Sequence, residues 1–349
     1  MPAFPLIFSR VAHSSLLSGL NGPLDLSAPL FCFGYECPSD FSSAKLNAGS
    51  SEHRTSVSPR TLFTEPSSTP YFCATLIQVP ANSIRPTIGV FDSGVGGLTV
   101  LRAIARLVPN ADYLFFGDTA RLPYGTKSQE FVARYSSRAA QFLAARGIDL
   151  LVIGCNTASA LALYDVKSAV SIPVIGVIEP GADAAAAISK SREALVFATE
   201  ATCASHAYQR ALARRGFATH EKPCPLLVPL VEEGWIDNPV TEQVARIYTI
   251  EALRTASINV DVLVLGCTHY PLLRPLLRRI VPQRIEIVDS AEATARALLQ
   301  YLNGHDLKAG EPTYKFFVTD SVEKFQKQAP VFLGFPVENV ERADLDSRH

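Results

Sequence analysis

The sequence predicts an α/β protein with two similar lobes, each a mainly parallel sheet flanked by helices. We expect a pseudo-twofold between the lobes and an active site in the cleft between them. From residue 87 onward, apolar segments of strand length alternate with segments of helical length, and this series runs twice. A closely similar strand-Gly-Cys segment occurs once in each series. The 349 residues, 48% hydrophobic, suffice for two ordinary domains with sizeable cores.

The first series of apolar and helical segments predicts the first lobe, at 87–184. Strands are expected at 87–91, 112–117, 150–154 and 174–178. Helices are expected at 98–108, 128–146 and 158–168. In the 128–146 segment, apolar residues recur close to helical spacing. Short apolar strands separated by helices are typical of a parallel sheet that is covered on both faces.

The second series predicts the second lobe, at 185–300. Strands are expected at 194–198, 262–266 and 285–288, and helices at 202–215, 240–257, 272–281 and 291–302. The C-terminal segment, 301–349, is expected to add strands at 316–319 and 337–340, and its return to the first lobe is one possibility.

Residues 1–86 differ from the rest in composition. They hold 15 Ser and 10 of the 24 Pro, with few charges and no persistent periodicity. Such a composition predicts a disordered N-terminal extension. A wrongly assigned start is the alternative. Because Met1 is the only methionine, a start further along the chain would have to use a non-Met codon, for instance at Leu76 or Val79.

Charge and cysteine usage exclude several classes of protein. The 32 Lys and Arg balance 33 Asp and Glu, which argues against nucleic acid as the main partner. No apolar run approaches the roughly 18 residues of a membrane helix. Seven scattered cysteines without a C-x-x-C pair fit neither a disulfide framework nor a zinc ribbon. We therefore expect a cytoplasmic protein with free thiols and no metal site.

Two matched segments suggest the chemistry. LVIGCNT (151–157) and LVLGCTH (263–269) place Cys155 and Cys267 at strand ends that open helices, 112 residues apart. Ligands of open α/β sheets bind at such strand ends, and a helix N-terminus is expected to lower the pKa of each thiol. Two acid–base groups on opposite sides of a cleft suit stereoinversion at a carbon. The alternative is that each cysteine is a small core residue.

A glycine-rich turn follows the first strand. The segment FDSGVGG (91–97) places backbone N–H groups and Asp92 at a helix start, where an anion can bind. It is neither a dinucleotide fingerprint, because Thr99 stands where a small residue is required, nor a P-loop. A plain tight turn is the alternative.

Five motifs together resemble those of the glutamate racemases of bacteria. They are FDSGVGG (91–97), GDTARLPYG (117–125), GCNTAS (154–159), PLVEEG (229–234) and GCTHYP (266–271). The resemblance covers about residues 87–340. It implies cofactor-independent interconversion of L- and D-glutamate, which supplies D-glutamate for peptidoglycan, and a possible homodimer.

The resemblance also implies roles for individual residues. Cys155 and Cys267 take the acid–base roles, assisted by Asp92 and His269 respectively, and Glu232 is an acidic site residue, with Glu233 as the alternative register. The implied substrate-binding residues are Asp92, Ser93, Tyr124, Gly125, Asn156, Thr157, Thr268 and His269. The sequence departs from the family at Ala201, where many members carry glycine, which weakens the case for Thr202 as a contact. The segment 1–86 is a further departure.

Two other functions stay open at this point. One is a racemase of the same superfamily that acts on aspartate or a related carbon acid. The other is a non-catalytic amino-acid-binding or regulatory protein on the same scaffold, although the presence of both cysteines and their acidic partners speaks against it.

Overall fold

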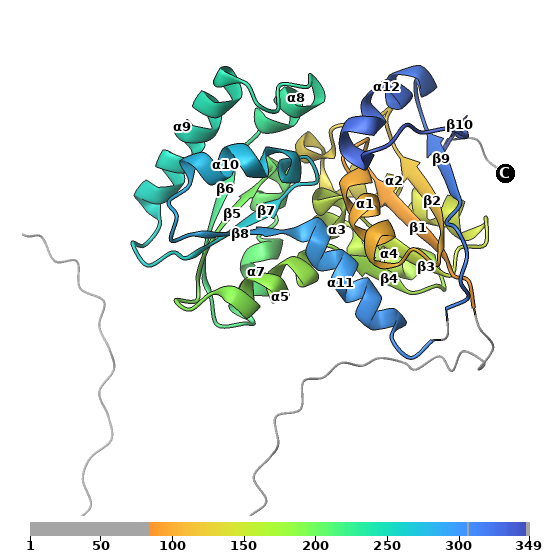
Figure 1. Ribbon diagram of the computed structural model, residues 1–349, viewed down its shortest axis with the longest axis horizontal. Coiled ribbons are helices and arrows are strands. Elements are labelled where there is room, and N and C mark those ends of the chain that lie inside the picture. Colours follow the sequence, from red (N-terminus) through yellow and green to blue (C-terminus); the bar gives the residue numbers. More distant parts are fainter. Residues whose placement is uncertain (1–83, 306, 347–349) are drawn as a thin grey trace, which may run out of the picture. The chain divides into compact units, whose positions relative to one another are not determined.

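The computed structural model describes residues 84–305 and 307–346, which form two parallel sheets (Figure 1). One sheet has six strands in the order β10-β9-β2-β1-β3-β4, and the other has four in the order β6-β5-β7-β8. The predicted extension at 1–86 lies outside the described residues, except for its last three. Of these, Ile84 forms a bridge with Leu307 and Arg85 pairs with Asp112 at 2.8 Å.

The first lobe contains the elements that the first series predicts. They are β1 (Thr87–Asp92), α1 (Leu98–Leu107), β2 (Asp112–Gly117), η1 (Tyr124–Thr126), α2 (Gln129–Ala144), β3 (Leu150–Ile153), α3 (Asn156–Leu161), α4 (Leu163–Ala169) and β4 (Val174–Gly176). Strands β1 and β3 are nearly continuous apolar runs, as expected for parallel strands whose two faces are both covered, and nearly all their residues are buried. The helix α2 begins where Ser128 accepts a hydrogen bond from the N–H of Phe131 (3.3 Å).

The second lobe follows directly. Its elements are α5 (Ile178–Ile188), β5 (Glu193–Ala198), α6 (Glu200–Ala204), α7 (Ala207–Ala213), β6 (Ala218–Pro223), α8 (Leu227–Glu232), α9 (Pro239–Thr255), β7 (Val262–Gly266), η2 (Tyr270–Leu273), α10 (Arg274–Ile280), β8 (Glu286–Asp289) and α11 (Ser290–Leu302). The chain then adds β9 (Tyr314–Val318), α12 (Val322–Leu333) and β10 (Val340–Arg342), and both strands lie in the sheet of the first lobe.

The strand orders confirm the predicted similarity of the lobes. The run β2-β1-β3-β4 in the first sheet corresponds to β6-β5-β7-β8 in the second. In this correspondence β3 matches β7, so the two matched Gly-Cys segments follow equivalent strands. All strand pairs in the described residues are parallel, and both sheets therefore gather their carboxyl ends at one edge.

Several helices and one strand depart from the sequence-based expectation. The helix expected at 158–168 is broken at Ala162, whose φ of −129° is not helical. The helix expected at 202–215 is broken at His206, which takes a left-handed φ of 52°. The pattern missed β6 because this edge strand, ATHEKP, is polar and only half-buried. It also missed α5, α8 and α12.

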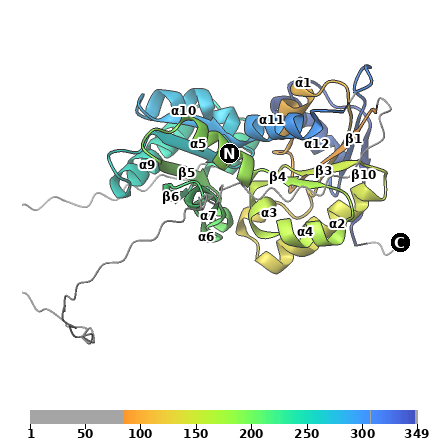
Figure 2. The same cartoon turned by 90° about the horizontal axis from the view of Figure 1, so that it is seen from below.

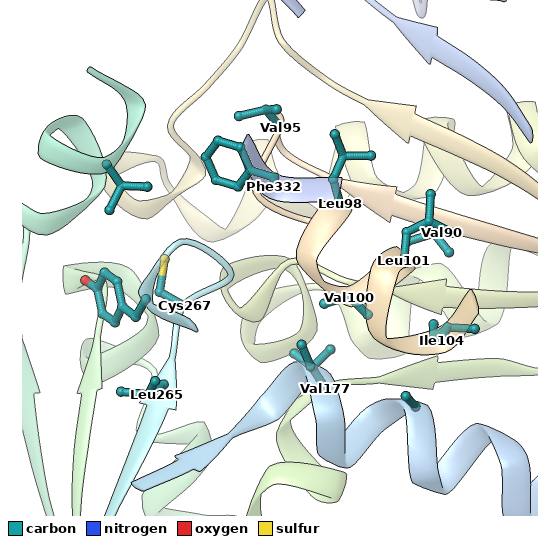
Figure 3. Close-up of a cluster of buried hydrophobic side chains, with 14 of the residues drawn as sticks. Val90, Val95, Leu98, Val100, Leu101, Ile104, Val177, Leu265, Cys267 and Phe332 are labelled. Carbon is teal, nitrogen blue, oxygen red and sulfur yellow. The ribbon is translucent and has the colours of Figure 1, made fainter. Parts of the chain in front are cut away.

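One hydrophobic core crosses from lobe to lobe. Helix α11 packs against α1 of the first lobe and α5 of the second, and it lies between the two sheets in both views (Figures 1 and 2). The same cluster contains Val90, Leu98, Leu265, Cys267 and Phe332, from both lobes and from α12 (Figure 3). No helix in the described part of the chain is long and apolar enough to cross a membrane.

Candidate active site

Loops from the carboxyl ends of both sheets meet at the interface of the lobes. The Thr99 hydroxyl, at the start of α1, donates to the carbonyl of Thr268 (2.9 Å), which follows β7. A side chain at Gly96 would collide with Thr268 and His269, so this turn needs glycine to approach the second lobe so closely. The glycine-rich turn after β1 and the loop after β7 therefore lie in direct contact.

Cys155 is the N-cap of α3, at the end of β3. Its sulfur accepts a hydrogen bond from the N–H of Ala158 (3.4 Å), and its thiol donates to the Ser93 hydroxyl (3.5 Å). Burial raises the pKa of Cys155 to about 12, and the nearby Asp92 carboxylate adds to this rise. The expectation that the helix N-terminus lowers this pKa is wrong, because the Ala158 hydrogen bond is outweighed by burial.

Asp92 ends β1 with one engaged and one unpaired oxygen. Its Oδ2 accepts from the N–H of Gly94 (2.9 Å), whereas its buried Oδ1 has no hydrogen-bond partner among the described residues. Burial raises the pKa of Asp92, and the charge of His269 opposes this rise. The free oxygen can thus receive a proton or bind an ammonium group.

Cys267 heads a buried relay of three side chains. Its sulfur lies 3.8 Å from Nδ1 of His269, whose Nε2 lies 3.1 Å from Oε1 of Glu232. Burial alone lowers the pKa of His269, but the contacts with Cys267 and Glu232 outweigh burial and raise it to about 10. Burial raises the pKa of Glu232. Its hydrogen bond with His269 and the charges of His269 and Lys324 together outweigh burial and leave the pKa below its usual value.

The two acidic residues at the end of α8 differ in their contacts. Glu232, at the end of α8, makes the contact with His269, while Glu233 is exposed at the helix C-cap. The carbonyl of Glu232 also accepts from Gln328 of α12 (3.2 Å), which ties the relay to the C-terminal helix. The ring of His269 packs edge-on against Phe332 of the same helix, with ring centroids 5.3 Å apart.

The predicted substrate-binding residues surround the two thiols with hydrogen-bonding groups. Asn156, Thr157 and Thr268 are each at most 5% exposed. The hydroxyl of Tyr124 donates to the buried Asp118 (2.7 Å), so the phenol is already engaged. Gly125 packs against Thr199 of the second lobe.

Sequence reasoning missed Thr199 and Tyr208 and gave less weight to Thr202, and the fold brings all three close to predicted site residues. Thr199 and Thr202 form a triangle of hydroxyls with Thr157, with oxygen separations of 2.9 to 3.2 Å. Thr202 therefore contacts a predicted substrate-binding residue, Thr157, despite the departure at Ala201. The hydroxyl of Tyr208 donates to Oδ1 of Asn156 (2.7 Å). No local signal marks Tyr208, because the contact joins residues of different lobes.

Other cysteine and histidine residues in the described part of the chain make different contacts. Cys203 and Cys224 are buried, and His206 is an exposed residue that pairs with Glu221 (2.9 Å). Within residues 84–305 and 307–346, no group of three His, Cys, Asp or Glu side chains is arranged to hold a metal ion.

Comparison with known proteins fits this geometry. The profile of the Asp/Glu/Hydantoin racemase family matches residues 88–298. The chain belongs to this family. A relative named glutamate racemase, from Koribacter versatilis, is 56% identical over 75% of this chain and 98% of its own length.

Solved structures of glutamate racemases share the fold of this family member. The isoform from Bacillus anthracis is 37% identical, with a TM-score of 0.71 over 77% of this chain and 100% of that one. The enzyme from Francisella tularensis, solved in complex with D-glutamate, is 34% identical, with a TM-score of 0.69 over 76% of this chain and 99% of that one. These matches confirm the predicted family and two-lobed fold; the roles of individual site residues stay predictions.

Proposed function

We propose that this racemase interconverts L- and D-glutamate by transferring protons between two thiols and the Cα of the substrate, without a cofactor. The observation that carries the proposal is the pair Cys155 and Cys267, which end equivalent strands of the two lobes. Each thiol has its own acid–base partners. The glutamate specificity is supported by the names of the relatives, of which one is 56% identical.

In the L-to-D direction, Cys267 acts as the base. Its thiolate takes the Cα proton of L-glutamate, and the C–H electron pair stays on carbon. Cys155 then donates its thiol proton to the opposite face, which forms the new C–H bond and leaves a thiolate on Cys155. Conversion of D-glutamate runs the same steps in reverse, so each thiol is the acid in one direction and the base in the other.

The partners of each thiol suit these two starting states. His269, with its pKa raised to about 10, is a cation at neutral pH and stabilises a thiolate on Cys267. The raised pKa of Cys155 keeps that thiol protonated and ready to donate. Asp92, whose charge helps raise the pKa of Cys155, has an unpaired oxygen that can receive or return a proton.

The Cα proton of an amino acid is only weakly acidic, so the site has to stabilise a carbanion-like state. Hydrogen bonds from Asn156, Thr157 and Thr268 to the substrate carboxylates would supply this stabilisation. The buried positions of these residues strengthen each such bond.

In the cell, the product D-glutamate would enter peptidoglycan synthesis, and the enzyme would act in the cytoplasm. A homodimer also stays a proposal, which sedimentation of the purified protein tests.

Exchange of the Cα proton with solvent tests the function directly. The full chain is incubated in deuterium oxide with L-glutamate, D-glutamate or L-aspartate, and Cα–H loss is followed by proton NMR. We expect exchange and racemisation with both glutamate isomers and neither with aspartate. Exchange with aspartate alone would assign the chain to the rival substrate, and binding without exchange would mean a non-catalytic protein.

A further inference from the structure

We propose that Tyr208 is a positioning residue that fixes the side-chain amide of Asn156 from the opposite lobe, so that the amide NH₂ faces the substrate. This inference rests on the proposed function, since it assigns Asn156 to a substrate carboxylate. Tyr208 lies on α7 of the second lobe, whereas Asn156 is the first residue of α3 and follows Cys155 in the first lobe.

The orientation of the amide follows from its two ends. Oδ1 of Asn156 accepts a hydrogen bond from the Tyr208 hydroxyl at 2.7 Å. Nδ2 of Asn156 is buried and has no hydrogen-bond partner within residues 84–305 and 307–346. A buried, unpaired amide donor is costly to a protein and marks a place where a ligand acceptor belongs. With Oδ1 occupied, the amide offers two N–H donors and no acceptor to the site.

The phenol is held as a donor. Tyr208 is fully buried, and burial raises its pKa above the ordinary value, which keeps the hydroxyl protonated at neutral pH. The ring packs against the backbone at the end of β7: a Cβ at Gly266 would lie 2.9 Å from a ring carbon of Tyr208. The glycine before Cys267 therefore makes room for the tyrosine that orients the residue after Cys155.

This arrangement links the two lobes through the residues beside both thiols. Because the hydrogen bond joins Asn156 to α7, the orientation of the amide depends on how the second lobe packs against the first. An amide that Tyr208 already holds in place loses less conformational entropy when the substrate binds than a freely rotating amide does. The hydrogen bond from Tyr208 therefore lowers the cost of substrate binding.

Tyr208→Phe tests the proposal because it removes only the hydroxyl and keeps the buried ring. We expect KM for both glutamate isomers to rise about 10-fold and kcat to change less than about threefold, the pattern of a lost ground-state binding contribution. Tyr113→Phe is the matched control. It removes a buried hydroxyl, bonded to the carbonyl of Val108, near the amino end of β2 and away from the thiols. We expect wild-type kinetics from it.

A double-mutant cycle separates positioning from a general structural effect. In the Asn156→Ala background, Tyr208→Phe should change KM by less than about twofold, because the amide it orients is gone. Multiplicative effects of the two substitutions, or an unchanged KM in Tyr208→Phe, would overturn the proposal.

Asn156→Asp tests the orientation even where Tyr208→Phe is too unstable to assay. The aspartate keeps an oxygen for Tyr208 and puts a second, charged oxygen where the NH₂ group lies. If NH₂ faces the substrate carboxylate, this variant binds glutamate more weakly than Asn156→Ala does. Equal or tighter binding would mean that an oxygen faces the substrate, and the proposal would fall. If the wild-type chain showed no exchange of the glutamate Cα proton with solvent, that result would instead refute the proposed function.

Discussion

The two thiols occupy equivalent positions in the two lobes but have different neighbours. Cys155 lies with a neutral hydroxyl, Ser93, and a buried carboxyl, Asp92, whose pKa is raised. Cys267 lies beside His269, which is backed by Glu232. The repeated strand order thus places the two thiols at equivalent strand ends, while the side chains around them differ.

This difference fits a reaction whose two directions must balance. L- and D-glutamate have equal free energies in water, which is achiral, so the equilibrium constant between them is one. The value of kcat/KM therefore has to be equal in both directions for every variant. Unequal surroundings of the two thiols can give different kcat and different KM values for the two isomers, but kcat/KM has to be the same for both. A bias between the isomers is therefore expected in kcat and in KM, and not in kcat/KM.

Removing either thiol should have the largest effect. In Cys155→Ala and Cys267→Ala we expect racemisation to fall by at least about 10³-fold in both directions, because inversion needs an acid on one face and a base on the other. Circular dichroism of glutamate measures the rate, and Cys203→Ala is the control for loss of a buried thiol. Substantial racemisation in either site variant would sink the two-thiol mechanism.

The partners of the thiols should come next, and they should act on different sides. Asp92→Asn and His269→Gln are each expected to lower kcat/KM about 100-fold, the usual range for an acid–base assistant. Because His269 serves Cys267, its replacement should slow kcat for L-glutamate more than for D-glutamate, with Asp92→Asn showing the opposite bias. Steady-state kinetics with each isomer measures both; the same bias in both variants would contradict the separate pairing.

The acidic pair on α8 gives a smaller effect with a built-in control. Glu232→Gln should lower kcat/KM about 10-fold, because His269 loses the carboxylate that helps hold its proton. Glu233→Gln removes the same charge one residue away, where the side chain is exposed, and should leave kcat/KM within about twofold. Equal losses in the two variants would point to a general effect of charge rather than to the relay.

The free energy of unfolding should depend on pH through the protonation of His269. The pKa of His269 is raised from 6.5 to about 10 on folding, so its stabilising contribution is complete below about pH 6.5 and is lost as the pH rises through about 10. Urea unfolding at pH 6, 8 and 10 should show the wild type losing more of its advantage over His269→Gln at each step. A constant difference between the two proteins across this range would contradict the raised pKa.

The sequence predicted the elements that have strong apolar signals. The strands 112–117 and 262–266 match β2 and β7 to the residue, because buried parallel strands are continuous apolar runs. The polar edge strand β6 carries no such signal. The helix break at His206, whose imidazole contacts Glu221 on that strand, carries none either. Local pattern does not encode either feature.

The same division holds for the site. The strand-end motifs single out Cys155, Cys267 and Asp92, and the resemblance to glutamate racemases adds His269. The choice between Glu232 and Glu233 needed the position of α8 relative to His269. The pKa of Cys155 was predicted in the wrong direction, because the helix terminus is visible in the sequence whereas the depth of burial is not.

By itself, the sequence determined the repeated α/β architecture, the two thiols and the family to which the chain belongs. Those conclusions rest on short-range order: apolar periodicity and residues that adjoin strand ends. Only the tertiary structure decided which acidic residue completes the relay, which state burial favours at Cys155, and that Tyr208 reaches Asn156 from the other lobe. These depend on distances between residues far apart in the chain, which the packing of two lobes around one core sets.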